Sequence, residues 1–420
     1  MTSGTAARFR ETADPDIESR PALHVVFFAS WLRFPHGMAE TIRARLIGRA
    51  LVEAGVSVHV LCLQAGERPP VVENTETRGC YKGVTFEYAA GTTRRQDSFV
   101  VRRLVEARGW LCGVRRLLQL RRQGKLDCVY LWSTWEHWSW LKLAYLQMLR
   151  ALRVPVVAEL NEWPGLFVKQ RPRFRAPRSD MRDAAGAVVI SSFLREWAVA
   201  EGLRLNRSLE LIQVPILVDV DEREPSEYPT GEPMVLFAGS PLYDENIRFV
   251  FRAMEAVWRE FPTCRLVVTG ANPADPAARW LLEQARGYVE GVEIAGYVSR
   301  TDLLKKYAAA HALLIPLPDD VRSRARFPTK IGEYLAASRP IVTTSVGEVR
   351  RYFTDGENAF VCEPGDEEAY GAKICEALRE PLRAAAIGRA GRETARQFFD
   401  YALYGETLRE GFLRVRARRS

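Results

Sequence analysis

The stretch that decides the fold is residues 22–63, ALHVVFFASWLRFPHGMAETIRARLIGRALVEAGVSVHVLCL. Residues 22–30 form a continuous apolar run bounded by polar residues, which is typical of a strand buried in a parallel sheet. Apolar residues then recur at helical spacing, and Gly55 is placed to end that helix. Residues 56–63 return to a strand pattern. The segment therefore predicts a strand–helix–strand unit with a right-handed crossover.

The same alternation of apolar strands and amphipathic helices continues along the chain. Further strand-like runs cover residues 126–133, 154–160, 183–192, 210–219, 234–240, 264–270, 292–298, 312–317, 340–345 and 359–364. An acidic, proline-containing segment at residues 221–233 interrupts the pattern and is typical of a linker. The sequence therefore predicts an α/β fold with two Rossmann-like, doubly wound domains that face each other across a cleft.

Five segments follow from this pattern. We expect a flexible leader at residues 1–21, a first domain at 22–220, the linker at 221–233, a second domain at 234–397, and a terminal helix with a basic tail at 398–420. No strand follows the terminal helix, so we expect it to pack back on the first domain. Ligands of doubly wound sheets bind beyond the carboxyl ends of the strands, which places the expected site in the cleft.

Composition excludes several classes of protein. The hydrophobic fraction of 47% and the charged fraction of 27% are ordinary for a soluble globular chain and exclude a disordered one. The seven cysteines form no C-x-x-C pair, so we expect neither zinc nor a disulfide framework, and a reducing compartment. The start of the chain resembles no signal peptide, and no run of about 18 apolar residues predicts a membrane span. The net charge of +8 suits an anionic ligand, and no nucleic-acid-binding module is recognisable.

Residues 324–348, RARFPTKIGEYLAASRPIVTTSVGE, carry the clearest chemistry. Pro328 suits the first turn of a helix because its missing N–H costs nothing there. The first free amides of that helix, near Thr329 and Lys330, meet the positive end of the helix dipole and form a site for an anion.

Three charged side chains extend this anion site. Arg326 and Lys330 add two positive charges, and Glu333 shares a helix face with Lys330. A nucleotide diphosphate fits such a site, because cations and amides bind its phosphates while a carboxylate one turn deeper accepts the ribose hydroxyls. An ordinary surface helix with a Lys–Glu pair stays open as the alternative.

The chain resembles the retaining, GT-B-fold glycosyltransferases of family 4 over roughly residues 23–400. The resemblance is clearest in RFPTKIGEYLAASRPIVTTSVGE, which is similar to the donor-site helix of that family. It extends, more weakly, over GMAETIRARLIGRALVEAGVSVHVLCL, DAAGAVVISSFLREW, VLFAGS and GYVSRTDLLKKYAAAHALLIPL. The resemblance implies transfer of a hexose-type sugar from a nucleotide-diphosphate sugar, bound by the second domain, to a glycan, lipid-linked or small-molecule acceptor bound by the first.

The resemblance also implies donor contacts, residue by residue. They are Gly239 and Ser240 in the loop after the first strand of the second domain, Tyr297 and Val298 beside the nucleotide base, Thr329 and Lys330 at the diphosphate, and Glu333 at the ribose. Three departures from the family pattern accompany them. Ala325 replaces the first glutamate of the E-x7-E motif, Pro328 replaces a glycine, and residues 239–247 lack the usual phosphate-binding cation, for which Arg326 or Arg248 would substitute.

The resemblance implies a retaining reaction in which the leaving phosphate takes the acceptor proton. Arg326 and Lys330 would stabilise the charge that grows on the diphosphate, so we expect no metal ion and no cofactor. Asn161 and Glu162 directly follow a predicted strand and would orient the acceptor or the sugar in the cleft. A loop cap below Trp163 is the open alternative for these two residues.

Four further residues are candidates for the acceptor or sugar side. Gly37 matches the glycine loop of the first domain, and His137 lies among tryptophans after a predicted strand. Gly347 and Glu348 begin a short helix after another strand. Aromatic packing at His137 and a plain helix start at Gly347 remain open.

Two other classes of function are weighed against a transferase. A GT-B sugar-nucleotide epimerase or a phosphorylase would need a histidine or cofactor lysine that the sequence does not place. A non-catalytic nucleotide-sugar-binding relative is suggested by Ala325. We expect a cytoplasmic protein of polysaccharide biosynthesis. The basic stretch 110–125 suggests a peripheral contact with the inner face of an anionic membrane, unless its leucines pack inward.

Overall fold

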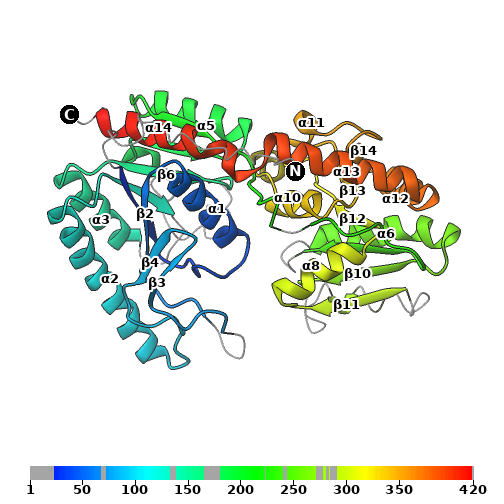
Figure 1. Ribbon diagram of the computed structural model, residues 1–420, viewed down its shortest axis with the longest axis horizontal. Helices are drawn as coiled ribbons and strands as arrows, with labels where there is room; N and C mark the ends of the chain where they lie inside the picture. Colours follow the sequence, from blue (N-terminus) through cyan, green and yellow to red (C-terminus); the bar gives the residue numbers. More distant parts are fainter. Residues whose placement is uncertain are drawn as a thin grey trace, which may run out of the picture.

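The computed structural model describes residues 23–67, 72–132, 139–164, 180–222, 224–239, 244–270, 278–280, 283 and 291–418. The chain forms two lobes, and each lobe is built on its own sheet with helices on its faces (Figure 1). The predicted α/β fold with two doubly wound domains is confirmed.

The first sheet has the strand order β3-β4-β2-β1-β5-β6-β7-β8. Its strands are β1 (His24–Ala29), β2 (Ser57–Cys62), β3 (Arg78–Tyr81), β4 (Val84–Tyr88), β5 (Cys128–Trp132), β6 (Val156–Leu160), β7 (Gly186–Val189) and β8 (Glu210–Gln213). All neighbours pair in parallel except β3, which is antiparallel to β4. The strand–helix–strand unit of residues 22–63 is β1, α1 and β2, whereas the β3–β4 hairpin was not predicted.

The second sheet has the order β11-β10-β9-β12-β13-β14, and all its neighbours pair in parallel. Its strands are β9 (Met234–Ala238), β10 (Arg265–Thr269), β11 (Val292–Gly296), β12 (Ala312–Ile315), β13 (Ile341–Thr344) and β14 (Phe360–Cys362). The order reverses between β9 and β12, so the carboxyl end of β9 is the point at which doubly wound sheets bind ligands.

Helices cover both sheets. They are α1 (Ala39–Glu53), α2 (Phe99–Arg122), α3 (Ser139–Ala151), α5 (Ser192–Arg204), α6 (Asp244–Glu260), α8 (Arg300–Ala309), α9 (Val321–Ala325), α10 (Thr329–Ala336), α11 (Val349–Tyr352), α12 (Glu367–Arg379), α13 (Pro381–Phe398) and α14 (Gly405–Ala417), with 3-10 turns at Asp180–Arg182 and Tyr401–Tyr404. The predicted return of the terminal helix is confirmed. α14 packs on α1 and β8 of the first lobe and buries Leu408, Phe412 and Val415 in that lobe's core (Figure 1).

The chain crosses between the lobes twice, and the two crossings lie side by side. The Val218 N–H donates to the Phe399 carbonyl (2.9 Å), and the Tyr401 N–H donates back to the Val218 carbonyl (3.0 Å). One hydrophobic cluster continues through the junction, because Ile190 and Leu194 of the first lobe join Ala325 and Phe327 of the second. The lobes therefore share a packed contact.

A buried ion pair fixes the end of β6. Arg43 of α1 and Glu159 of β6 approach to 2.6 Å, with side chains that are 1% and 3% exposed. Arg43 also donates to the carbonyls of Val214 (3.0 Å) and Pro215 (2.5 Å), and Tyr130 bonds to Glu159. These contacts fix the strand that leads into Asn161 and Glu162.

Residues 110–125, the segment expected at a membrane, lie in and just after α2. Trp110, Leu117 and Leu120 of α2 are buried against the first sheet, whereas Leu111 is 73% exposed. Other exposed apolar side chains of α2 lie at its start, where Phe99 and Leu104 are more than half exposed. Within the described residues, no helix is long and apolar enough to cross a membrane.

Candidate functional site

The amino end of α10 lies at the carboxyl end of β9. Lys330 donates from Nζ to the Ala238 carbonyl (2.5 Å), and the Ala238 N–H donates to Tyr334 Oη (3.2 Å). The helix begins at Thr329, because Pro328 is its N-cap with extended backbone (φ −63°, ψ 120°). Pro328 was predicted inside the first turn, and the structure places it just before that turn. The free amides of α10 thus lie at the edge where a parallel sheet binds ligands.

Positive charge is concentrated at this helix start. The pKa of the Lys330 ammonium is lowered to about 8, because desolvation, reinforced by the charge of Arg326, outweighs the opposing effect of Glu333. Two like charges that disfavour each other at the end of a helix dipole are stabilised by a bound anion. The predicted cluster of Arg326, Lys330 and helix amides is therefore brought together.

Glu333 lies one turn deeper and is already engaged. Its Oε1 accepts a hydrogen bond from Arg300 Nη1 (2.7 Å), and its Oε2 accepts from Tyr307 Oη (3.3 Å). Burial, followed by the charge of Glu333, raises the pKa of Tyr307 well above its usual value, so the phenol stays a donor. The carboxylate keeps lone pairs for further donors.

Arg300 connects this carboxylate to the linker and the first lobe. Its Nη2 bonds to Glu222 Oε2 (3.1 Å), and Glu222 Oε1 lies 3.9 Å from the Arg45 guanidinium of α1. A chain of alternating charges therefore runs from α1 to α10.

Glu162 faces the second lobe across the cleft. Its Oε2 lies 3.9 Å from Arg322 Nε of α9. Burial raises the pKa of Glu162, while Arg326 and Arg322 lower it and Asp320 raises it. The carboxylate that follows β6 thus shares Arg326 with the anion site at α10, which links the two lobes electrostatically.

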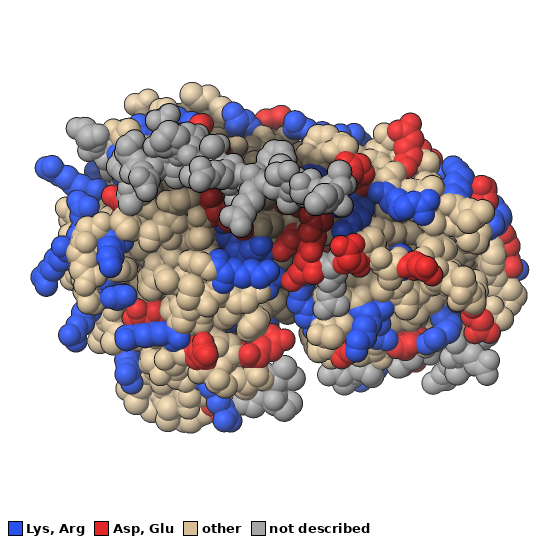
Figure 2. Space-filling view, viewed as in Figure 1, with Lys and Arg blue, Asp and Glu red and all other residues tan. Residues whose placement is uncertain are grey.

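A second carboxylate, Glu40 in the first turn of α1, lies beside Glu162. Glu40 is exposed to solvent on one side. Desolvation by the surrounding protein raises the pKa of its carboxyl group, the charge of Glu162 raises that pKa further, and Arg33 lowers it. Figure 2 shows the molecule notched between its lobes, with side chains of both signs at the inner end of the notch. Glu162, with Glu40 beside it, thus lies close to Arg322 and Arg326 of the second lobe.

Close approaches occur at two predicted glycines, Gly37 and Gly239. A Cβ at Gly37 would lie 2.4 Å from Thr41 Oγ1 and 2.9 Å from the Arg33 carbonyl, so only glycine fits this turn before α1. Gly239 follows β9, and a Cβ at Gly270 would lie 2.4 Å from the Gly239 carbonyl. The loops after β9 and β10 thus touch beside the Lys330 site.

The remaining predicted residues lie at varied places. Asn161 directly follows β6, and Tyr297 and Val298 follow β11, with Tyr297 largely exposed. Arg248 lies over the Trp280 ring (4.2 Å), and this stacking engages the side chain that was expected to substitute at the phosphates. His137 and Ser240 lie outside the described residues.

Glu348 and Gly347 belong to the junction of the lobes. Glu348 Oε1 accepts from the Ser192 N–H at the start of α5 (2.7 Å), and the Ser191 hydroxyl donates to the Ala325 carbonyl (2.5 Å). Gly347, at φ +57°, packs against the backbone of Arg324. These residues join the lobes beside the cleft.

Burial explains why position 325 is occupied by alanine. Ala325 ends α9, is fully buried, and belongs to the hydrophobic cluster that spans both lobes. A glutamate in this place would bury a charge in an apolar contact. The neighbouring acidic pair of residues 318–320 is also structural, since Asp320 accepts from the Ser323 N–H (2.6 Å) to cap α9 and Asp319 pairs with Arg324 (2.7 Å).

Sequence reasoning missed Arg300, Arg322, Glu222 and Glu40. Arg300 is the first residue of α8, just beyond the carboxyl end of β11, and a charged residue at such a strand edge was the available signal. Arg322 and Glu40 lie on helices that follow β12 and β1 in the same way. In the parts of the chain that the structure describes, no three metal-ligating side chains come together.

Comparison with known proteins is consistent with this geometry. Residues 232–380 match the family described as Glycosyl transferases group 1. Glycogen synthase of Mycobacterium tuberculosis is 25% identical over 174 residues, which are 41% of this chain and 40% of that protein. The chain thus spans less than half the length of this curated relative.

Solved structures resemble the whole chain. Sucrose-phosphate synthase from Thermosynechococcus elongatus has a TM-score of 0.68 at 16% identity and covers 94% of this chain and 100% of its own. Anabaena HepE in complex with UDP-glucose has a TM-score of 0.59 at 14% identity and covers 93% and 99%. At such identities the likeness concerns the fold, which is the two-domain GT-B fold.

Proposed function

We propose, from the match of residues 232–380 to the group 1 glycosyl transferases, that this chain transfers a hexose-type sugar from a nucleotide-diphosphate sugar to a glycan, lipid-linked or small-molecule acceptor. One observation carries the proposal. Lys330 and Arg326 gather at the amino end of α10, and Lys330 lies against the carboxyl end of β9. A diphosphate is the anion that suits two cations and a helix end.

The donor binds with its diphosphate at this site. Lys330, Arg326 and the first amides of α10 neutralise the two phosphates, so the proposal needs no metal ion. Glu333 accepts the ribose hydroxyls with the lone pairs that Arg300 and Tyr307 leave open. A relative of the same fold, Anabaena HepE, was solved with UDP-glucose, which supports a sugar nucleotide as donor.

The reaction replaces one bond at the anomeric carbon. The bond to the diphosphate oxygen breaks, and negative charge grows on the leaving group, where Lys330 and Arg326 stabilise it most strongly in the transition state. The acceptor hydroxyl bonds to the anomeric carbon on the same face, and its proton passes to the leaving phosphate oxygen. Configuration is thereby retained.

The acceptor approaches from the wall of the first lobe. Glu162 and Asn161 follow β6, and Glu162 lies close to Arg322 of the second lobe, so they orient the acceptor hydroxyl or the transferred sugar. Gly37 keeps the loop before α1 close to this point. Burial raises the pKa of both Glu40 and Glu162, and Glu162 raises that of Glu40 further, which suits contact with hydroxyl groups more than with a second anion at this place.

Ala325 favours a second candidate, a protein that binds the donor without turning it over. Its methyl group is buried in the contact between the lobes, and the sequence offers no glutamate there for the sugar. Both candidates require the same diphosphate site. They differ in whether the bound donor is consumed.

The test is a thermal-shift screen against UDP-, GDP-, ADP- and dTDP-glucose, followed by assays of nucleotide release from the donor that binds. We expect one donor to raise the melting temperature, and slow donor hydrolysis to follow. Lys330→Ala should lose both effects, while Lys305→Ala, which removes an exposed lysine of α8, should keep them. Donor binding without any turnover with or without acceptors would favour the non-catalytic candidate, and no donor binding would refute both.

A peripheral membrane contact is proposed for the start of α2. Phe99, Val100 and Leu104 are exposed there beside Arg102 and Arg108. Apolar side chains with flanking arginines suit the surface of an anionic bilayer. Such a contact would bring a lipid-linked acceptor to the first lobe.

A further inference from the structure

We propose that Arg300 is a positioning residue of the donor site, which holds the carboxylate of Glu333 so that it accepts both hydroxyls of a ribose and thereby favours ribonucleotide over 2′-deoxyribonucleotide donors. This inference rests on the proposed function, because it concerns the choice of donor at the same site. Arg300 is the first residue of α8 and lies just beyond the carboxyl end of β11, at the ligand-binding edge of the second sheet.

Arg300 bridges two carboxylates from different parts of the chain. Its Nη1 donates to Glu333 Oε1 of α10 (2.7 Å), and its Nη2 donates to Glu222 Oε2 in the segment between the lobes (3.1 Å). By contrast, Lys305 of the same helix pairs with its neighbour Asp302, and both of those side chains are more than half exposed. A planar guanidinium that is held at two nitrogens has a fixed orientation. Arg300 is therefore placed to orient Glu333.

The burial of Glu333 makes this partner necessary. Its side chain is 11% exposed, and a carboxylate so far withdrawn from water is stable only with paired charges and hydrogen bonds. Burial lowers the pKa of Arg300, but the charges of Glu333 and Glu222 raise it above its usual value. The guanidinium therefore stays charged at every working pH, and its hold on Glu333 does not change with pH.

The contacts of Glu333 leave one acceptor position on each carboxylate oxygen. A carboxylate offers about four lone-pair positions, two on each oxygen. Arg300 uses one on Oε1, and the buried hydroxyl of Tyr307 uses one on Oε2 (3.3 Å). The two positions that remain lie on neighbouring oxygens and match two hydroxyls on neighbouring carbons, as in a ribose. A 2′-deoxyribose has only one of these hydroxyls and forms one charge-assisted hydrogen bond fewer.

The orientation of the carboxylate is set before the donor binds. Without Arg300, the side chain of Glu333 would rotate, and the order needed for two hydrogen bonds would be created only on binding, at a cost in affinity. Tyr307 fixes the second oxygen, because its ring packs edge-on against Tyr334 with 5.0 Å between the ring centres. The Tyr334 hydroxyl in turn accepts from the Ala238 N–H at the end of β9. The carboxylate is thus held from both sides.

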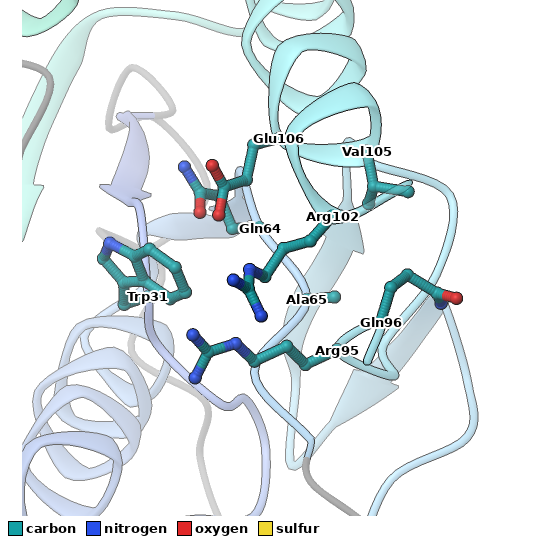
Figure 3. A pocket seen from close by; sticks show the side chains of 8 residues that line it. All are labelled: Trp31, Gln64, Ala65, Arg95, Gln96, Arg102, Val105 and Glu106. Carbon is teal, nitrogen blue, oxygen red and sulfur yellow. The ribbon is translucent and has the colours of Figure 1, made fainter. Parts of the chain in front are cut away.

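The small cavity of the first lobe does not provide an alternative site for the ribose. It is lined by Trp31 after β1 and Gln64 after β2, together with Arg95 and Arg102 (Figure 3). Its space of about 10 Å³ suits one water molecule and not a sugar ring. Such a water would bond to the Gln64 amide, which is 1% exposed and has no hydrogen-bond partner among the described residues. The choice between ribose and deoxyribose is therefore assigned to the second lobe.

The experiment measures the dissociation constants of UDP and 2′-deoxy-UDP for the full chain by calorimetry, with the base changed to the one that the thermal-shift screen selects. Both ligands carry the same diphosphate, so the ratio of their constants is insensitive to the net charge of the site. We expect the wild type to prefer the ribonucleotide about fivefold, and Arg300→Met to reduce this preference to about twofold. Arg300→Lys keeps the charge without the planar fork and should lie between them. Lys305→Met, on the exposed surface of the same helix, should keep the wild-type ratio.

A double-variant cycle separates positioning from a general effect on the fold. In a Glu333→Gln background, Arg300→Met should leave the ratio unchanged, because no carboxylate remains to be oriented. Glu222→Gln weakens only the second anchor of Arg300 and should lower the ratio by a smaller factor. It keeps the inference testable if Arg300→Met does not fold.

Three results would overturn the inference: equal binding of both nucleotides by the wild type, a wild-type ratio in Arg300→Met and Glu222→Gln, or an equal fall of the ratio in the Glu333→Gln background. Failure of the proposed function is distinguishable from these results. Nucleotides that bind with the expected ratios while no donor is consumed would leave Arg300 assigned and the transfer refuted. An unchanged ratio in variants that still transfer sugar would do the reverse.

Discussion

Arg300 Nη1 lies 2.7 Å from Glu333 Oε1, so the carboxylate proposed to bind ribose is paired before any ligand arrives. Arg300 reaches Glu222 with its other nitrogen, and Glu222 lies 3.9 Å from Arg45 of the first lobe. The donor site is thus connected by charge to the junction of the lobes. Substitutions at this pair test the site directly.

Glu333→Ala should weaken the binding of UDP, or of whichever nucleotide the screen selects, by about tenfold, because two charge-assisted hydrogen bonds to the ribose are lost. Pyrophosphate lacks ribose and should bind the variant as it binds the wild type. Calorimetry with both ligands makes the comparison, and Glu293→Ala, which removes an exposed acidic partner of Lys306 in the same lobe, is the control. An equal loss for both ligands would contradict the ribose role.

Nucleotide affinity should fall as the pH rises through about 8. Burial lowers the pKa of Lys330 to about 8, so the free protein loses this ammonium as the pH rises above that value, and an anion binds the protonated form. The expected slope is up to tenfold in the dissociation constant for each pH unit between 8 and 10. Lys330→Gln should bind weakly at all these pH values and show no such slope. A wild-type affinity that stays constant to pH 10 would refute the contact.

The lowered pKa of Lys330 has the opposite effect on the free energy of unfolding, which should rise with pH where nucleotide affinity falls. Because the folded pKa of Lys330 lies below the usual value of about 10.4, the unfolded chain binds more protons between these values. The contribution of this group to the free energy of unfolding should therefore increase between pH 8 and 10. Chemical denaturation of the wild type and of Lys330→Gln across this range isolates the difference, and a difference that is independent of pH would contradict the lowered pKa.

Glu159→Ala should lower the free energy of unfolding by roughly 3–5 kcal/mol, because it leaves Arg43 buried without its partner. Replacing both residues, as Arg43→Met with Glu159→Leu, should cost less than the single change. Denaturation by urea measures both. Glu260→Ala, which removes an exposed pair with Arg379, should cost far less than Glu159→Ala. A double variant less stable than Glu159→Ala would refute the unpaired charge as the cause.

Phe99→Ser combined with Leu104→Ser should reduce flotation with anionic liposomes severalfold, since both side chains are exposed at the start of α2. Leu382→Ser removes a still more exposed leucine from the second lobe and should have no effect. A wild-type chain that does not float with anionic liposomes would exclude this membrane contact.

Local sequence was sufficient for most of the fold. The apolar run of β1, the helical spacing of α1 and the strand pattern of β2 each extend over a few residues. Backbone geometry alone sets the side-chain period over that length. Pro328 and the spacing of Arg326, Lys330 and Glu333 placed the helix start and its charges for the same reason. The β3–β4 hairpin was missed because β3 is a short strand at the sheet edge and carries little apolar pattern.

The sequence by itself determined two α/β domains, a returning terminal helix and a cationic helix start, since each depends on periodicity, capping and composition. Only the tertiary structure decided which distant residues meet: Arg43 with Glu159, Arg300 with Glu333, Glu162 with Arg322, and Gln64 with the arginines before and on α2. These pairings join residues far apart in the chain. The crossing of the chain between lobes and the packing of two sheets bring them together, and no local pattern encodes that distance.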